Sequence, residues 1–442
     1  MLRVAVLDRA VLWDLATRIL GAATGLITAL IVAHTFSPTL QGFHYTFLSL
    51  LSLQIFLELG LSGIITTFSN HEWAFLGIDK DGRVVGDPRA LSRLFSLVKF
   101  AMQWFATAGV AIAIILICAG YYFLSTARSD DQVQWLGPWI ALSLLTGANL
   151  IVLPIWAILR GCNQVADINF FRFIDGFFRA GAVWITILLG AGLWSTPIAS
   201  LTGFILATFF LWLRYRRFLT SVFLAPSGEA VRWKEEILPL QWRIALTWLS
   251  GYFVFSLFTP ALFYFQGPVV AGQMGMTWAF VTGIGGIAGT WMHTRATQFG
   301  ALVANKEYAK LDSVVRQAGL IGFGVACLGG LVLLGIVIGL DTMQNDFRHR
   351  LLPLGTIAVF VFAEALHQLP IALACYLRAF KREPFLLIGL TNGLFVGAST
   401  IIFAKYNGAM GVAIAYLLGI ILATVWGSMI FVRCRLEWTQ GE

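Results

Sequence analysis

The sequence predicts an all-α polytopic membrane protein with 12 transmembrane helices in two six-helix lobes that are related by a parallel internal repeat. An apolar composition, a series of long apolar segments and a set of repeated motifs together predict this fold class. Of 442 residues, 58% are hydrophobic and 12% are charged, and the mean hydropathy is +0.81. Soluble domains are about half apolar and about a quarter charged. The excess apolar surface must therefore face lipid, which excludes a soluble enzyme.

Twelve segments have the length and composition of spanning helices. A span needs about 20 mostly apolar residues, because only a helix satisfies its own backbone hydrogen bonds inside lipid. We expect an N-terminal lobe over 1–217, a cytoplasmic linker over 218–243 and a C-terminal lobe over 244–442. The expected spans are 11–33, 45–68, 100–124, 136–159, 174–193 and 198–212, followed by 244–265, 269–292, 320–340, 351–377, 385–404 and 409–432.

The basic residues predict the orientation of the spans. If both termini are cytoplasmic, the inner side carries 23 of the 30 Lys and Arg residues, the outer side carries four, and three fall within or at the mouth of a span. Cytoplasmic loops are enriched in Lys and Arg, so this asymmetry supports an even number of spans. The expected outer connections are short, which leaves no room for an outer domain.

Motifs recur between the two halves at a nearly constant spacing. Leu-Pro-Ile at 153–155 returns at 369–371, at an offset of 216, and Asp-Gly at 175–176 corresponds to Asn-Gly at 392–393, at 217. The run IASLTGFILAT at 198–208 returns as IAYLLGIILAT at 414–424, with eight of eleven positions identical.

A weaker correspondence joins Pro38 and Gly42 to Pro268 and Gly272. Six spans per repeat make both halves enter the membrane from the same side, which gives a pseudo-twofold axis along the membrane normal. Two such lobes are suited to alternating access, although duplication alone would also build a bundle without a moving cavity.

Three arginines within or at the mouth of spans are candidates for anion binding. Arg18 and Arg179 each follow an aspartate by four residues, and Arg243 opens the seventh span. An ionisable residue in a span costs about 2.5–3.5 kcal/mol on insertion scales. Each one must therefore pair with an opposite charge, extend its charged end to the membrane surface, or have a function. As neutralised anchors or topology residues they would only be structural. As cavity residues, their guanidinium groups would bind an anion such as a diphosphate.

Three further ionisable residues are candidates for ion coupling or gating. Glu58 and Glu364 lie about thirteen residues into their expected spans, or roughly 20 Å, and His367 follows Glu364 by one turn. Glu364 and His367 can exchange a proton near neutral pH. Hydrogen bonding of a buried glutamate to neighbouring helices for packing is the structural alternative, especially for Glu58.

The sequence contains no catalytic or metal-binding constellation. The five cysteines form no CxxC pair, the histidines have no ligand spacing, and Walker, HExxH and GxSxG motifs are missing. We therefore expect no enzymatic activity, no metal, no cofactor and no nucleic acid partner. Energy for transport must come from a gradient or from the cargo.

The segment 36–70 resembles polysaccharide transporters, in which a loop Pro and Gly precede a span that ends in an acidic-Leu-Gly-Leu motif. Here the acidic residue is Glu58 and the following glycine is Gly60. Leu-Arg-Gly at 159–161, Leu-Arg-Ala at 377–379 and YNGAMGVAIA at 406–415 extend the resemblance over most of the chain. The family is the O-antigen and exopolysaccharide flippase branch of the multidrug/oligosaccharidyl-lipid/polysaccharide exporter (MOP) superfamily.

The resemblance implies movement of an undecaprenyl-diphosphate-linked oligosaccharide across the bacterial cytoplasmic (inner) membrane, for O-antigen, lipopolysaccharide or exopolysaccharide synthesis. The expected partners are the polyprenyl-linked glycan, membrane lipids, and polysaccharide polymerase and chain-length proteins. The diphosphate would be the anion that Arg18, Arg179 and Arg243 bind. Of the site residues, only Glu58 corresponds to a family motif.

Other membrane functions are consistent with part of the sequence. A related drug exporter would share the two lobes but usually carries cations, which an arginine-lined cavity does not suit. A major-facilitator porter has the same span count, and GIDKDGRVV at 77–85 only faintly matches its loop motif. A glycan polymerase or ligase would need a long outer loop, and none is expected here.

The predicted orientation can be tested with a reporter. Green fluorescent protein fused to the C-terminus should fluoresce in a bacterial host, because the predicted terminus is cytoplasmic. A dark fusion, together with an active periplasmic reporter at the same position, would contradict the assignment.

Overall fold

The computed structural model describes residues 9–126, 133–223, 228–380 and 385–440, without the side chains of residues 234, 239, 240, 243, 247, 297 and 436–440. The chain forms two compact units. The first contains the described residues up to Phe36, the segment Leu50–Thr126 and the residues 133–248. The second contains Ser37–Ser49 and the chain from Leu249 onward.

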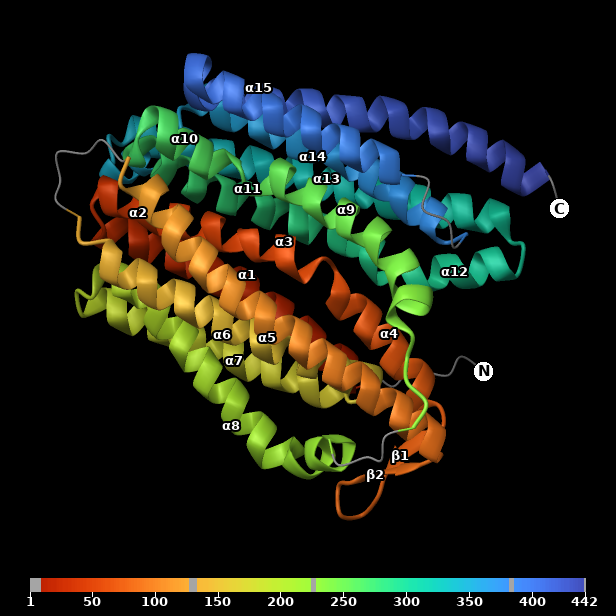
Figure 1. The fold of residues 1–442 in the computed structure, drawn as a ribbon. Coiled ribbons are helices and arrows are strands. Elements are labelled where there is room, and N and C mark those ends of the chain that lie inside the picture. Colours follow the sequence, from red (N-terminus) through yellow and green to blue (C-terminus); the bar gives the residue numbers. More distant parts are fainter. Residues whose placement is uncertain (1–8, 127–132, 224–227, 381–384, 441–442) are drawn as a thin grey trace. The chain divides into compact units, whose positions relative to one another are not determined.

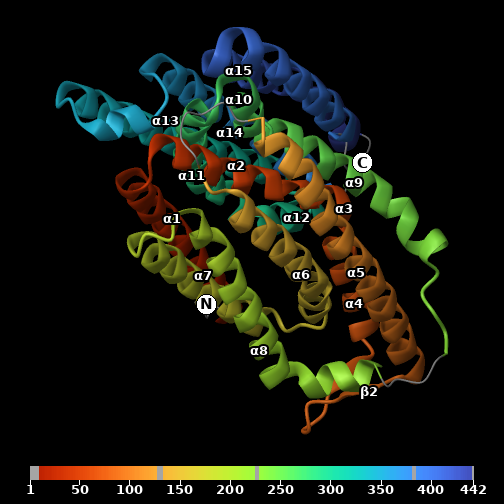
Figure 2. The same cartoon turned by 60° about the vertical axis from the view of Figure 1, so that its left-hand side comes forward.

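In its described residues, the first unit is helical apart from one small hairpin (Figure 1). Its strands β1 and β2 pair antiparallel, and the hairpin lies beside the C-terminal end of helix α8, where the Val84 amide donates to the Ser221 hydroxyl at 3.0 Å (Figure 2). Its elements are α1 (Arg9–Thr35), η1 (Ser52–Gln54), α3 (Ile55–Glu58), α4 (Leu61–Trp73), β1 (Leu76–Ile78), β2 (Val84–Gly86), α5 (Pro88–Leu124), α6 (Leu136–Gly161), α7 (Val165–Leu188), η2 (Gly192–Trp194), α8 (Ser195–Phe223) and η3 (Trp233–Ile237).

In the part that the structure describes, the second unit is built of helices. Helices α13, α14 and α15 pack side by side in it (Figure 1). Its elements are α2 (Pro38–Leu51), the C-terminal part of α9 (Leu238–Phe255), α10 (Phe258–Gln266), α11 (Pro268–Thr294), α12 (Ala296–Ala304), α13 (Tyr308–Thr342), η4 (Asp346–Arg350), α14 (Leu354–Arg378) and α15 (Leu386–Gln440).

The helices confirm the predicted all-α polytopic fold. Among the described residues, seven helices are long and apolar enough to cross a membrane, and two bent pairs bring the number to nine. α15 consists of two helices that meet at Gly408, where φ is 59°. α7 and α11 have span lengths of 24 and 27 residues. Together these helices overlap all twelve expected spans.

Helices α2 and α11 meet through glycines that correspond to each other in the internal repeat. A Cβ on Gly42 would overlap the carbonyl group of Pro268, and a Cβ on Gly272 would lie 2.8 Å from the backbone nitrogen of Gly42. Beside them, the buried amide of Gln41 donates to the Gly272 carbonyl at 2.9 Å. Only glycine allows this approach of the two backbones, which explains why the weak Pro and Gly correspondence is present in both halves.

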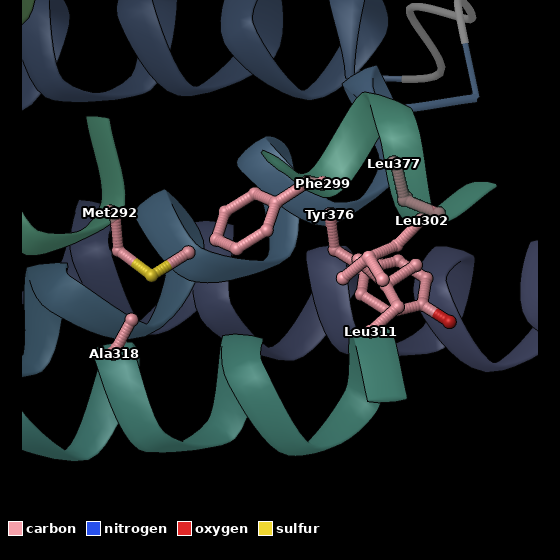
Figure 3. Close-up of a cluster of buried hydrophobic side chains, with 7 residues drawn as sticks. All are labelled: Met292, Phe299, Leu302, Leu311, Ala318, Tyr376 and Leu377. Atoms are coloured by element: carbon pink, nitrogen blue, oxygen red, sulfur yellow. The ribbon is translucent and has the colours of Figure 1, made fainter. Parts of the chain in front are cut away.

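A cluster of buried apolar side chains packs one end of the second unit (Figure 3). Phe299 of α12 and Leu311 of α13 are fully buried in it, and Tyr376 of α14 adds its ring while its hydroxyl donates to Asp312 at 3.0 Å. The remaining members are Met292, Leu302, Ala318 and Leu377. The cluster therefore fixes α12 against the spans α13 and α14.

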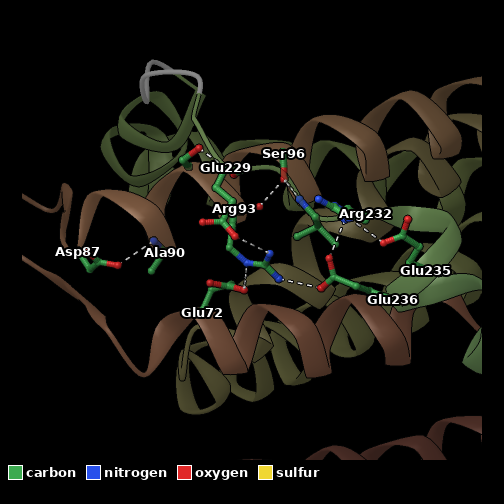
Figure 4. A network of polar contacts seen from close by, with 11 residues as sticks. Glu72, Asp87, Ala90, Arg93, Ser96, Glu229, Arg232, Glu235 and Glu236 are labelled. Atoms are coloured by element: carbon green, nitrogen blue, oxygen red, sulfur yellow. Dashed lines mark hydrogen bonds and ion pairs between the residues drawn. The ribbon is translucent and has the colours of Figure 1, made fainter.

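The segment before α9 is held on the first unit by the guanidinium of Arg93 (Figure 4). Arg93, near the start of α5, lies 2.8 Å from both Glu72 of α4 and Glu236 of η3. The pKa of Glu236 is lowered, chiefly because its carboxylate accepts the backbone N–H of Arg232 and also because it pairs with Arg93. The ring of Trp233 stacks on Phe100 at 3.7 Å, so one cation and one aromatic contact attach the expected 218–243 linker to α5.

Loss of the Arg93 cation should release this segment. We expect Arg93→Ala to increase the rate of chymotrypsin cleavage after Trp233 by roughly fivefold to tenfold, because the paired carboxylates then repel each other and local opening becomes easier. Arg89→Ala is the matched control, since Arg89 is exposed one turn earlier on α5. Equal cleavage of both variants, measured by timed digestion and mass spectrometry, would contradict the assigned role.

Candidate functional site

The carboxylate of Glu364 is buried inside the second unit. It lies on α14 with 6% of its surface exposed, and the hydroxyl of Tyr416 on α15 donates to its Oε2 at 2.8 Å. On α11, a Cβ on Gly285 would overlap this carboxylate, so glycine is needed there to make room for it. Three helices thus define one position for a single acidic group.

His367 is the basic residue paired with Glu364 in the described part of the chain. Its Nδ1 lies 3.5 Å from Glu364 Oε1, and this nitrogen is buried without a hydrogen-bond partner among the described atoms. The separation is slightly longer than a hydrogen bond, so a small rotation of the imidazole brings the two groups together. The pair has the geometry for proton exchange, and its role in coupling stays a prediction.

Aromatic rings surround the ring of Tyr416, whose hydroxyl contacts Glu364. The ring centroids of Trp278, Phe258 and Phe360 lie 5.2, 5.7 and 6.1 Å from the Tyr416 ring. Such a wall excludes water and lowers the local dielectric, which strengthens the hydrogen bond to Glu364 and makes an unpaired charge there costly.

The second expected span is broken, a feature that the sequence did not predict. α3 ends at Glu58, and the chain bends by 47° into α4. Leu59 and Gly60 both have left-handed backbones, with φ of 51° and 68°. Glycine adopts this conformation freely, but leucine does not, so the break is strained. The Ser62 hydroxyl donates to Glu58 at 2.8 Å across the break.

Each bent span has a tryptophan at its break. The Trp104 indole donates to the Leu57 carbonyl at 3.2 Å beside the first break, and the Trp278 indole donates to the Phe255 carbonyl at 3.0 Å where α9 gives way to α10. A carbonyl freed by a helix break costs several kcal/mol in hydrocarbon unless it is hydrogen-bonded. The indoles therefore allow these breaks inside the membrane.

Two of the predicted arginines lie on neighbouring parallel helices of the first unit. Arg18 Nε is 2.8 Å from Asp14 on α1, and Arg179 Nε is 2.9 Å from Asp175 on α7. The Arg18 side chain is 60% exposed, whereas that of Arg179 is 34% exposed. The Arg179 guanidinium packs on α8 at Gly203, where a Cβ would overlap it.

The contacts between α1 and α7 determine how far along the two helices these ion pairs lie relative to each other. Asn169 donates to the Ala10 carbonyl at 3.0 Å near the start of both helices, and Trp184 donates to Thr28 at 2.9 Å further along. The helices therefore run in the same direction. α7 begins at Val165 rather than at residue 174, so Asp175 and Arg179 lie further inside the helix than the sequence predicted.

The six predicted site residues therefore form separate groups. Glu364 and His367 lie together in the second unit, whereas Arg18, Arg179 and Glu58 belong to the first. The side chain of Arg243 lies outside the described residues.

Sequence reasoning missed Tyr416, although the repeat contained a signal for it. Tyr416 replaces Ser200 in the otherwise similar runs 414–424 and 198–208. In the first unit Ser200 accepts a hydrogen bond from Asn149 of α6 at 3.2 Å, so corresponding helix pairs carry a polar contact in both units.

Known proteins are similar to this chain in fold. No protein-family model matches the sequence, and no curated protein matches it. The structure is similar to that of the lipid II flippase MurJ in an inward closed conformation, with a TM-score of 0.69 and 14% identity over 97% of this chain and 90% of that one. The chain has the fold of MOP superfamily transporters.

Multidrug transporters of this superfamily are also similar. The MATE multidrug transporter DinF-BH matches with a TM-score of 0.63 and 15% identity, over 98% of this chain and 96% of that one. An inward-facing multidrug resistance MATE family transporter of the MOP superfamily gives 0.58 and 15%, over 92% and 98%. The chain thus has the fold of the superfamily that its sequence resembles. It is a multi-pass membrane protein.

The space at Gly285 tests the packing of Glu364. Gly285→Ala should lower the melting temperature of the purified protein, because the added methyl displaces the carboxylate from Tyr416 and such overpacking costs about 1–3 kcal/mol. Gly283→Ala on the same helix is the control, since nothing lies within 4 Å of a Cβ there. Equal melting temperatures for the two variants would show that the Glu364 carboxylate is not held against α11.

Proposed function

We propose that the chain moves an undecaprenyl-diphosphate-linked oligosaccharide from the cytoplasmic to the outer leaflet of the bacterial inner membrane by alternating access. Both termini lie in the cytoplasm in this proposal. The glycan serves O-antigen or exopolysaccharide synthesis, and polysaccharide polymerase and chain-length proteins are the expected partners. The similarity to a lipid II flippase is consistent with a lipid-linked cargo.

The observation that carries the proposal is the pair of Asp-x-x-x-Arg ion pairs on α1 and α7. Leu20, two residues beyond Arg18 on α1, lies beside Gly176 of α7, 3.5 Å from where a Cβ would be. Arg18 therefore lies at about the same height along the helices as Asp175. One ion pair would be enough to anchor a helix at the membrane surface. A second pair at a similar height on the adjacent helix adds an insertion cost, because each ionisable residue in a span costs energy, and so indicates a further role. A diphosphate can replace the aspartates, because guanidinium groups bind phosphate oxygens in a bidentate manner.

Glu364, with Tyr416 and His367 beside it, provides the ion-coupled part of the proposal; these three residues are the Glu364 cluster. With Glu364 ionised, it accepts the Tyr416 hydroxyl and attracts a protonated His367; with Glu364 protonated, that attraction disappears. The cluster therefore has two states that differ in the position of a proton, and such a pair of states can bias a conformational equilibrium. Glu58, at the strained break between α3 and α4, is the corresponding gating candidate in the first unit.

A drug exporter is the second candidate function. The similarity to MATE multidrug transporters supports it, as does the combination of Glu364 with the rings of Trp278, Phe258 and Phe360, because carboxylates and aromatic faces both attract organic cations. Against it, the Glu364 carboxylate already contacts Tyr416 and is buried.

Transport in proteoliposomes tests the proposal. Vesicles containing the protein should move a fluorescent undecaprenyl-diphosphate oligosaccharide between leaflets. The variants Arg18→Ala, Arg179→Ala and Arg243→Ala should each reduce the rate by about tenfold or more, because each removes a charge-assisted contact with phosphate. Glu364→Gln should remove the pH dependence of transport, because glutamine does not titrate.

The control for these variants is Arg216→Ala. Arg216 is exposed on α8, with its guanidinium over the Trp212 ring at 5.3 Å, and should transport as the unaltered protein does. Full transport by all three arginine variants would refute the cationic site, and export of organic cations without lipid movement would favour the drug exporter.

A further inference from the structure

A cavity of about 270 Å³ lies in the first unit between α5 and the segment 228–230. This segment forms one wall, and residues spaced three or four apart on one face of α5 form the other. The residues of α5 that line it are Ser92, Phe95, Ser96, Lys99, Phe100 and Gln103. Pockets for drug-sized ligands measure about 300–1,000 Å³, so this cavity is suited to a smaller group.

Hydrogen bonds to two serines of α5 hold the segment 228–230 in place. The buried Ser92 hydroxyl donates to the Glu229 carbonyl at 2.9 Å, and the Val231 amide donates to the Ser96 hydroxyl at 2.9 Å. A Cβ on Gly228 would lie 2.9 Å from Ser92 Oγ, so glycine allows the segment to approach the helix this closely. The cavity therefore has two walls that are fixed relative to each other.

The cavity lining contains one cation and one anion, and both are accessible to a ligand. Lys99 is exposed and forms no ion pair with any residue that the structure describes. The side chain of Glu229 is 59% exposed, and its carboxylate lies 3.8 Å from Arg93 Nη1, which is too far for a hydrogen bond. Arg93 instead binds Glu72 and Glu236, each at 2.8 Å (Figure 4). The Glu229 carboxylate can therefore accept hydrogen bonds from a ligand.

These polar residues follow one another in a definite order along α5. Lys99 directly precedes the expected span, which begins at Phe100. The Glu229 carbonyl is bonded to Ser92, seven residues before Lys99 on α5, or about 10 Å further from the hydrocarbon. Gln103 lies one turn inside the span, about 6 Å beyond Lys99. From the aqueous side inward, the cavity thus presents a carboxylate, an ammonium group and an amide.

The same face of α5 continues beyond Gln103 as an exposed and mostly apolar stripe. Val110 and Ile114 have exposed fractions of 57% and 56%. Thr107, between Gln103 and Val110 on this face, donates its hydroxyl to carbonyls of its own helix and so adds no free polar group. Such a stripe within a span is suited to an acyl chain. The ligand that fits the cavity and the stripe together has a small charged head and an apolar chain.

We propose that this cavity binds a phospholipid whose head group carries a primary amine, such as phosphatidylethanolamine. The phosphate binds Lys99, the ammonium group donates to Glu229, and the Gln103 amide donates to an ester carbonyl. Phosphatidylcholine has no N–H to donate, and phosphatidylglycerol brings no positive charge to Glu229. The inference is independent of the cargo, because the lipid is a bound component that connects the segment before α9 to the bilayer.

Native mass spectrometry of the purified full chain tests the site. From micelles with equal amounts of the three lipids, the unaltered protein should retain phosphatidylethanolamine about fivefold more than phosphatidylcholine or phosphatidylglycerol. Lys99→Gln and Glu229→Gln should each abolish this preference. The matched controls are Lys80→Gln, in the exposed loop of the hairpin, and Glu235→Gln, which pairs with Arg232, and both should keep it.

Exchange of the two charges distinguishes a lipid site from a direct contact between Lys99 and Glu229. The double variant Lys99→Glu/Glu229→Lys keeps the net charge but reverses the order of the charges along α5. The head group then no longer fits, so the preference for phosphatidylethanolamine should stay lost. An ion pair between the two side chains would be restored by the exchange. Recovery of the preference in the double variant would therefore overturn the inference.

Hydrogen exchange in nanodiscs locates the lipid on the protein. Replacement of phosphatidylcholine by phosphatidylethanolamine should slow exchange a few-fold in the peptide that contains Val231, because the bound head group stabilises the segment. This comparison uses the unaltered protein, so it decides the matter even where a variant does not fold. Equal retention of the two lipids, preference for phosphatidylglycerol, unchanged exchange at Val231, or displacement of the lipid by equimolar soluble phosphoethanolamine would overturn the inference.

Discussion

The need to satisfy every polar group inside hydrocarbon determines much of this structure. Lipid offers no hydrogen bonds, so a broken helix or an ionisable side chain within a span must find its partner in the protein. The indoles of Trp104 and Trp278 accordingly meet the Leu57 and Phe255 carbonyls at the two breaks. The hydroxyl of Tyr416 does the same for Glu364. These contacts make the irregular and charged positions possible, and those positions are where a transporter acts.

The two halves of the repeat have acquired different chemistry. The first unit carries arginines, two of them paired with aspartates, along α1 and α7. The second unit instead contains a buried glutamate in an aromatic environment, and the position that is Ser200 in the first unit is occupied there by Tyr416. Duplication thus provided the scaffold, and divergence left arginine–aspartate pairs in one half and a buried glutamate in the other. In our proposal the arginines bind the anionic cargo and the glutamate exchanges a proton.

The sequence predicted the spans and their repeat because hydropathy and motif spacing depend on local composition. It also predicted the proximity of Glu364 and His367, since helical geometry places residues three apart on one face. The break after Glu58 could not be predicted in the same way, because Leu59 and Gly60 lie in an apolar run without proline and the strain is offset by distant contacts. The partner of Glu364 likewise depends on tertiary packing, because Tyr416 lies 52 residues further along the chain.

Native mass spectrometry of the protein purified from its own membrane is the most direct test of the central claim, which is that the arginines of the first unit bind a diphosphate-linked lipid. The account predicts retention of a lipid with the mass of a polyprenyl diphosphate, with or without its glycan, and loss of that adduct in the Arg18→Ala/Arg179→Ala variant. Retention of only phospholipids by the unaltered protein, or an adduct that survives both substitutions, would contradict it.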